Sequence, residues 1–161
     1  MRGIFCGVIV VAARLLAPGL VSGQTKAPAI YSVDAGAVGH LGTGGRAGLF
    51  AGFQYQRPIG SWAAGGVGLS AFAQSTVAPE VSLLIPAASR KVNWFTGVGA
   101  GYGVRLSGNG LHGPFAMIRG GVTVPIRGSL GGRIEVRLAK LTGSQGTLGI
   151  VSLGLAQYLD P

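Results

Sequence analysis

Charged residues are few in this sequence, and several of them recur at every second position. In Arg133-x-Glu135-x-Arg137, three charges would share one face of a β-strand, because strand side chains alternate between faces. Equivalent faces of other segments complete a candidate lumen charge network of Asp34, Glu80, Arg105, Arg119, Arg133, Glu135 and Arg137. Charges in a narrow interior need partners, so this set predicts a salt-bridge network that fills a barrel. An anion-selective path is the alternative, since arginine outnumbers carboxylate.

Residues suited to catalysis, metal binding or cofactor binding are scarce. The histidines are His40, at the end of a segment, and His112, in a predicted loop, and neither has an identifiable nucleophile as a partner. Glycine recurs at every second position in GVGAGYGVR (97–105), whereas a dinucleotide-binding loop has the spacing G-x-G-x-x-G before a helix. We therefore expect no catalytic, metal or cofactor site, and hence no enzyme.

The first 23 residues have the features of a secretory signal peptide. A short basic start is followed by the mostly apolar residues 4–20 and by Val21-Ser22-Gly23, which are small enough for a signal peptidase. We predict a cleavable signal peptide at 1–23 and one domain at 24–161. Cleavage would remove Cys6, so disulfides would not stabilise the mature domain.

Composition argues against an ordinary water-soluble surface. Hydrophobic residues make up 48% of the chain and charged residues only 11%, whereas about 25% charged is usual. Without Arg2 and Arg14, 11 basic residues face 4 acidic ones, a net charge of +7. The basic residues are scattered rather than clustered, so nucleic acid is not expected as a partner. Too few charges remain to cover an exterior in water, which indicates an exterior in lipid.

Eight segments of alternating residues follow the signal peptide. They cover 30–41, 46–56, 61–73, 80–86, 94–105, 115–126, the region around 133–138, and 147–158, with the fourth taken as the shortest. Each has one apolar face and one face of glycine, serine or isolated charges. With the apolar faces against lipid, the glycines relieve crowding inside, and the strands must close because lipid satisfies no sheet edge. The pattern predicts an all-β fold, an eight-stranded antiparallel up-and-down transmembrane β-barrel.

The signal-like start, the eight segments and glycine-rich strands such as GRAGLFAGFQYQ and WFTGVGAGYGVR resemble the small eight-stranded outer-membrane β-barrel proteins of Gram-negative bacteria. The resemblance covers nearly all of 24–161. It implies localisation in the outer membrane, insertion by the outer-membrane assembly machinery, and both termini in the periplasm. It also implies contact with outer-membrane lipid. As a separate hypothesis, outward basic residues such as Arg46 and Lys140 would contact lipopolysaccharide phosphates.

Two features depart from that family. Members usually end on an aromatic residue that the assembly machinery reads, whereas this chain ends in QYLDP, in which Tyr158 would have to serve. The predicted outward loops are also short, none being longer than the SGNGLHG region.

Aromatic residues gather at the predicted periplasmic ends of the segments. These are Tyr31, Tyr55, Trp62, Trp94 and Tyr158, which would form an interfacial aromatic girdle, although aromatic residues also favour strands in general. The predicted function is a structural or surface-interaction role in the outer membrane, without catalysis. Two alternatives are a soluble secreted β-barrel that binds a small apolar ligand and a narrow, porin-like anion-conducting barrel.

Overall fold

The structure, a computed structural model, describes residues 29–41, 47–72, 75–88, 92–107, 112–142 and 146–159. These residues form eight strands: β1 (Ala29–Leu41), β2 (Gly48–Pro58), β3 (Ala64–Phe72), β4 (Thr76–Ala88), β5 (Asn93–Arg105), β6 (Gly113–Arg127), β7 (Leu130–Leu141) and β8 (Thr147–Leu159). The predicted signal peptide and Arg46 lie outside the described residues. No helix in the described ranges is long and apolar enough to cross a membrane.

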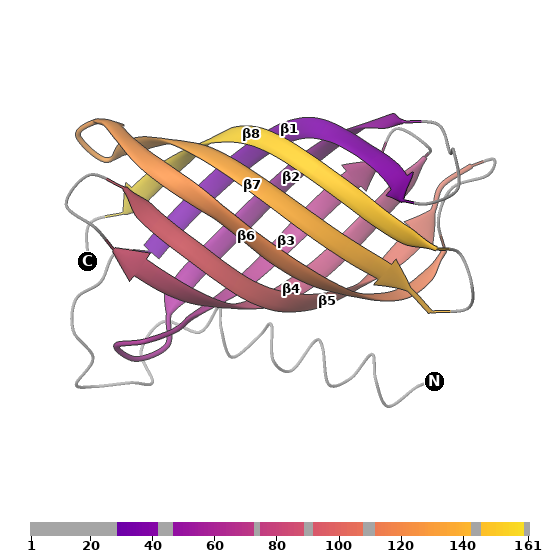
Figure 1. Ribbon diagram of the computed structural model, residues 1–161, viewed down its shortest axis with the longest axis horizontal. Helices are drawn as coiled ribbons and strands as arrows, with labels where there is room; N and C mark the ends of the chain where they lie inside the picture. Colours follow the sequence, from indigo (N-terminus) through magenta and orange to yellow (C-terminus); the bar gives the residue numbers. More distant parts are fainter. Residues whose placement is uncertain are drawn as a thin grey trace.

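The strands close into one antiparallel barrel in sequence order (Figure 1). Each strand pairs with its sequence neighbours, and β1 closes the sheet against β8 from Ala29 opposite Leu159 to Leu41 opposite Thr147. Between β6 and β7 the connection is the turn Gly128-Ser129, where Gly128 has a φ of 55° that favours glycine. The predicted all-β, eight-stranded up-and-down barrel is confirmed.

The fourth strand differs from its predicted extent. The sequence suggested a short strand at 80–86, but β4 has 13 residues, and the shortest strand described is β3 with 9. Pro79 and Pro86 obscured the pattern, because proline has no backbone N–H to donate to a neighbouring strand. The structure accommodates Pro79 by a gap in the β4–β5 pairing, which passes from Val77 to Glu80, while Pro86 lies opposite Phe95.

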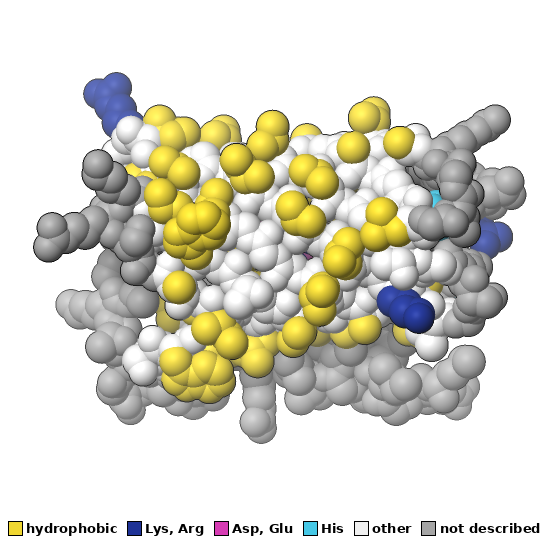
Figure 2. All heavy atoms as spheres, viewed as in Figure 1, with side chains coloured by type: hydrophobic (Ala, Val, Ile, Leu, Met, Phe, Trp, Pro, Cys, Tyr) yellow, Lys and Arg dark blue, Asp and Glu magenta, His cyan; other side chains and the backbone are white. Residues whose placement is uncertain are grey.

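The outer wall of the barrel is apolar. Every strand places large hydrophobic side chains outside, for example Val33, Leu49, Leu69, Ile85, Val98, Ile118, Ile134 and Leu153. Figure 2 shows hydrophobic side chains spread over the face of the wall in view, with the Lys and Arg side chains of this view toward the two ends of the barrel. The wall thus has the surface that a barrel needs in order to contact lipid.

The interior consists of three layers along the barrel axis. Near the end where β1 begins and β8 ends, apolar side chains surround an open space, here called the mouth cavity. The middle holds the charge layer, defined as Asp34, Glu80, Arg119, Arg133, Glu135 and Arg137, all of which are buried. The far half holds the apolar plug, defined as Val38, Phe50, Phe72, Ala78, Phe115, Met117, Ala139, Leu141, Leu148 and Ile150.

Candidate functional site

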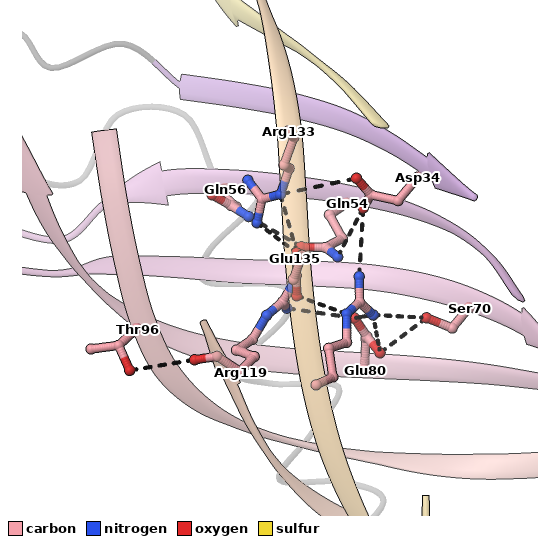
Figure 3. Close-up of polar contacts among 10 residues, drawn as sticks. Asp34, Gln54, Gln56, Ser70, Glu80, Thr96, Arg119, Arg133 and Glu135 are labelled. Atoms are coloured by element: carbon pink, nitrogen blue, oxygen red, sulfur yellow. Dashed lines mark hydrogen bonds and ion pairs between the residues drawn. The ribbon is translucent and has the colours of Figure 1, made fainter. Parts of the chain in front are cut away.

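The charge layer is built by inward positions of four strands. β7 supplies Arg133, Glu135 and Arg137, because its residues alternate strictly between buried and exposed from Arg133 to Leu141. β1, β4 and β6 supply one member each, as Figure 3 shows for Asp34, Glu80 and Arg119. Three guanidinium groups therefore meet three carboxylates, so the layer as a whole carries no net charge.

Glu135 is the centre of the layer, with 0% of the residue exposed. Its Oε1 accepts a hydrogen bond from Arg137 Nε at 2.7 Å and forms an ion pair with Arg119 Nη2. Its Oε2 accepts hydrogen bonds from Arg133 Nη2 at 2.9 Å and from Arg133 Nε at 3.1 Å. One carboxylate thus compensates part of the charge of all three arginines.

Two arginines lie directly opposite each other across the β6–β7 pair. Arg119 and Arg137 are register partners, an arrangement that is unfavourable for like charges unless something lies between them. Glu80 reaches both from β4, with its Oε1 at 3.1 Å from Arg137 Nη1 and 3.6 Å from Arg119 Nη1. Ser70 donates a hydrogen bond to Glu80 Oε2 at 3.1 Å and so orients that carboxylate.

Asp34 completes the charge layer on the side of β1, and Gln54 on β2 forms hydrogen bonds to two of its members. Asp34 forms ion pairs with Arg137 at 3.5 Å and with Arg133 at 4.0 Å. Gln54 donates to Asp34 Oδ2 at 3.4 Å, while its carbonyl accepts from Arg119 Nη2 and from Gln56 Nε2. The side-chain amide of Gln54 on β2 therefore links the carboxylate of Asp34 on β1 to the guanidinium of Arg119 on β6.

Glycines make room for these long side chains. Asp34 has Gly52 and Gly154 as its two cross-strand neighbours, and Glu80 has Gly68 and Gly101. Arg119, Arg133 and Glu135 are flanked by Gly97, Gly154 and Gly121 respectively. A Cβ at Gly68 would lie 3.1 Å from Cγ of both Glu80 and Gln54. The alternating glycines of 97–103 therefore provide interior volume for the side chains of the neighbouring strands.

Aromatic rings cover the charge layer on both sides. The Arg133 guanidinium lies 4.0 Å from the centre of the Phe95 ring, and that of Arg137 lies 4.8 Å from the centre of the Phe50 ring. Beyond Phe50, residues of the apolar plug line a void of about 10 Å³, which has room for no more than one water molecule. In the described residues the charges are therefore enclosed rather than arranged along an open path.

Arg105 requires a correction. The sequence placed it in the lumen charge network, but it is exposed at the end of β5, opposite Thr76. Gly101 is the β5 residue opposite Glu80, so Arg105 lies four residues farther along, roughly 13 Å at about 3.3 Å per residue. Alternation along a strand predicts which face of the sheet a side chain occupies, but not its position along the barrel axis. Because β5 extends past the apolar plug to the rim, Arg105 lies at the rim.

Gln54, Gln56 and Ser70 also belong to the site, although they were not predicted from the sequence. The available signal was Gln54-x-Gln56, two polar side chains on the face of β2 that carries Gly52. All three residues are buried in the structure.

Four of the five residues of the predicted aromatic girdle are exposed or lie on the outer wall, and the fifth faces the interior. Trp62 and Trp94 are 63% and 57% exposed, and Tyr31 packs on Tyr55 with ring centres 4.8 Å apart on the outer wall. Tyr158 needs a correction, because it lies on the inward face of β8 with Ser152 and Ala156. Its hydroxyl accepts a hydrogen bond from Asn93 at 3.1 Å across the mouth cavity.

Both histidines lie away from the charge layer. His112 precedes β6, with its Nε2 3.4 Å from the Tyr102 hydroxyl, and His40 lies near the end of β1 opposite Leu148. Among the described residues, no group of three or more His, Cys, Asp or Glu side chains is placed to hold a metal ion.

The fold is similar to that of solved structures, although no similar sequence was found. No family model matches the sequence, and no curated protein matches it. The N-terminal β-barrel domain of OprF from Pseudomonas aeruginosa is similar in structure, with a TM-score of 0.58 and 6% identity, over 84% of this chain and all of that one.

Two structures of the outer membrane protein Ail from Yersinia pestis are also similar. The crystal structure gives a TM-score of 0.54 at 11% identity, over 84% of this chain and 98% of that one. The structure in a phospholipid bilayer nanodisc gives 0.52 at 13% identity, over 81% and 99%. The chain therefore has the fold of the small eight-stranded outer-membrane β-barrels.

Proposed function

We propose that the protein is an integral protein of the bacterial outer membrane, with a structural or surface-interaction role and no catalysis. The observation that carries the proposal is the distribution of polarity. The described strands present an apolar wall outside, while their three carboxylates and three of their arginines are enclosed and compensated inside. Such a wall is stable against hydrocarbon, and the likeness to OprF and Ail supports an outer-membrane setting.

Gel mobility tests this proposal directly. The protein would be extracted from membranes and run in mild SDS with and without boiling. A closed barrel that resists detergent would change mobility on heating, and the protein would fractionate with the outer membrane. Recovery in the soluble periplasmic fraction, without a mobility shift, would contradict the proposal.

Export is part of the same proposal. Cleavage after Gly23 would leave Gln24 as the first residue of the mature protein, which intact-mass analysis of the membrane fraction would detect. A protein that retains 1–23 would contradict it. Insertion would then depend on the outer-membrane assembly machinery, with Tyr158 in the terminal signal.

The two alternative functions fit the geometry less well. A soluble carrier of apolar ligands needs a polar exterior, whereas the exterior here is hydrophobic on every strand. An anion-conducting barrel needs an open, positively charged path. The buried arginines are instead compensated by carboxylates, and the apolar plug fills the lumen beyond them.

Phosphate groups of lipopolysaccharide are the partner we propose for the loop end of the barrel. Lys140 is exposed there, near the end of β7, and the three carboxylates of the described strands all lie in the charge layer. A basic rim without nearby carboxylates would attract phosphate. Arg46, in the β1–β2 connection, would contribute to the same rim.

Outer-membrane permeability in a deletion strain tests this partner. The strain would be complemented with wild type, with Arg46→Ala plus Lys140→Ala, or with Arg57→Ala plus Arg127→Ala, which removes equal charge at the opposite end. We expect the first pair to leave the deletion phenotype partly uncorrected and the second pair to restore the barrier. Wild-type behaviour of the Arg46 and Lys140 variant would refute the role of these residues.

A further inference from the structure

The mouth cavity is not used by the proposed function. It has a volume of about 230 Å³ and lies inside the end of the barrel where β1 begins and β8 ends. All eight strands contribute to its lining, so it belongs to the lumen and not to a surface groove. It therefore has the position of a binding site that opens toward one side of the membrane.

The walls of the mouth cavity are mostly apolar, and the polar side chains of Gln56, Asn93 and Arg133 in its lining have partners within the protein. Ile30, Ala64, Leu84 and Phe95 supply hydrocarbon surface, and Tyr158 adds a ring whose hydroxyl accepts a hydrogen bond from Asn93. Arg133 forms part of the lining, but it is held by Glu135 at 2.9 Å and lies over the Phe95 ring. The site thus offers contact area and aromatic faces rather than a charge for an ionic ligand.

The charge balance of the lumen excludes ionic ligands on energetic grounds. The three arginines of the charge layer already face three carboxylates, so a bound anion or cation would add an uncompensated charge next to them. Burying such a charge is costly, whereas a neutral molecule replaces water at apolar walls with little electrostatic penalty.

The size of the mouth cavity limits the ligand to about one ring. An apolar cavity of about 150 Å³ accepts benzene, and pockets for drug-sized ligands begin near about 300 Å³. The rings of Phe95 and Tyr158 favour an aromatic guest through stacked or edge-to-face contacts. We propose that the mouth cavity binds a small neutral aromatic molecule of one ring that enters from the end of the barrel where β1 begins.

Ligand binding to the full processed barrel in lipid nanodiscs tests the proposal. Fluorine NMR would follow 4-fluorotoluene as the neutral probe and 4-fluorobenzoate as its charged counterpart, with empty nanodiscs correcting for partition into lipid. Ala64→Leu would fill the cavity, and Ala71→Leu makes the same change on the outer face of the same strand as a control. Heat-dependent gel mobility would verify that each variant is folded.

We expect saturable binding of the neutral probe to wild type and to the Ala71→Leu variant, and a Kd at least about tenfold higher for Ala64→Leu. The charged probe should not bind. Binding that never exceeds partition into empty nanodiscs, equal binding by the Ala64→Leu variant, or equal binding of the benzoate would each overturn the proposal. Should Ala64→Leu fail to fold, Leu84→Ala replaces it, because a larger cavity should then admit 1-fluoronaphthalene, and failure to do so would count against the site.

Discussion

Replacing Glu135 with Gln tests the energetic role of the charge layer. The substitution keeps the size of the side chain and one carbonyl acceptor, but it removes the charge that Arg119, Arg133 and Arg137 share. Three buried guanidinium groups would then face two carboxylates. The excess positive charge would lie where no water compensates it, because Glu135 is fully buried.

The expected loss of stability follows from that excess charge. Removing one member of a buried ion pair costs about 3–5 kcal/mol, against a total of roughly 5–15 kcal/mol for a folded domain. If the free energy of unfolding falls by about 2 kcal/mol per molar urea, the unfolding midpoint should fall by about 1.5–2.5 M. Glu135→Gln combined with Arg133→Gln restores the charge balance and should lose less than the sum of the two single variants, by about 1–3 kcal/mol.

The assay is reversible urea unfolding in phospholipid vesicles, followed by tryptophan fluorescence and by gel mobility. Coincident unfolding and refolding curves are required before midpoints are compared. A Glu135→Gln midpoint within about 0.25 M of wild type, or strict additivity in the double variant, would refute the reasoning that the layer stabilises by charge compensation.

Three further predictions concern the interior and the rim. Gly101→Val should destabilise the barrel by about 1–3 kcal/mol or prevent its closure, because a Cβ there would meet the Phe115 ring and the Pro79 carbonyl oxygen. The control, Ala100→Val on the outer face of the same strand, should be near neutral; urea unfolding measures both variants. Planar bilayers with the purified protein should show no steady anion current; regular anion-selective openings would contradict the plugged lumen. Trp62 and Trp94, in single-tryptophan variants, should be quenched more by lipids brominated near the headgroup than near the chain end, and the reverse order would exclude an interfacial position.

The strand pattern was readable because its period is a local property. Alternation in 130–141 separates Arg133, Glu135 and Arg137 from Ile134, Val136 and Leu138 without information from other strands. The extent of β4 was not readable in the same way, since Pro79 suggests a strand end unless the neighbouring pairing is known to tolerate a gap.

The position of an inward side chain along the barrel axis depends on the register between strands, which the sequence of one strand does not determine. Asp34 and Arg137 meet only because β1, β8 and β7 are staggered as they are, and the same stagger carries Arg105 away from them. The role of Gln54 depends on Arg119, 65 residues later in the chain. The mouth cavity likewise exists only after all eight strands have closed around it.

Three of the six charges of the charge layer lie on β7, so the register between β7 and its neighbours decides whether these charges face the lumen or the lipid. A shift of one residue between β7 and its neighbours would turn Arg133 and Arg137 toward lipid and Ile134 and Val136 inward. Arginine at the middle of a bilayer costs about 2–4 kcal/mol, so two would cost about 4–8 kcal/mol, comparable with the whole stability of a domain. Misaligned barrels would therefore be poorly populated, so the arginines of β7 would favour the native alignment while the barrel forms.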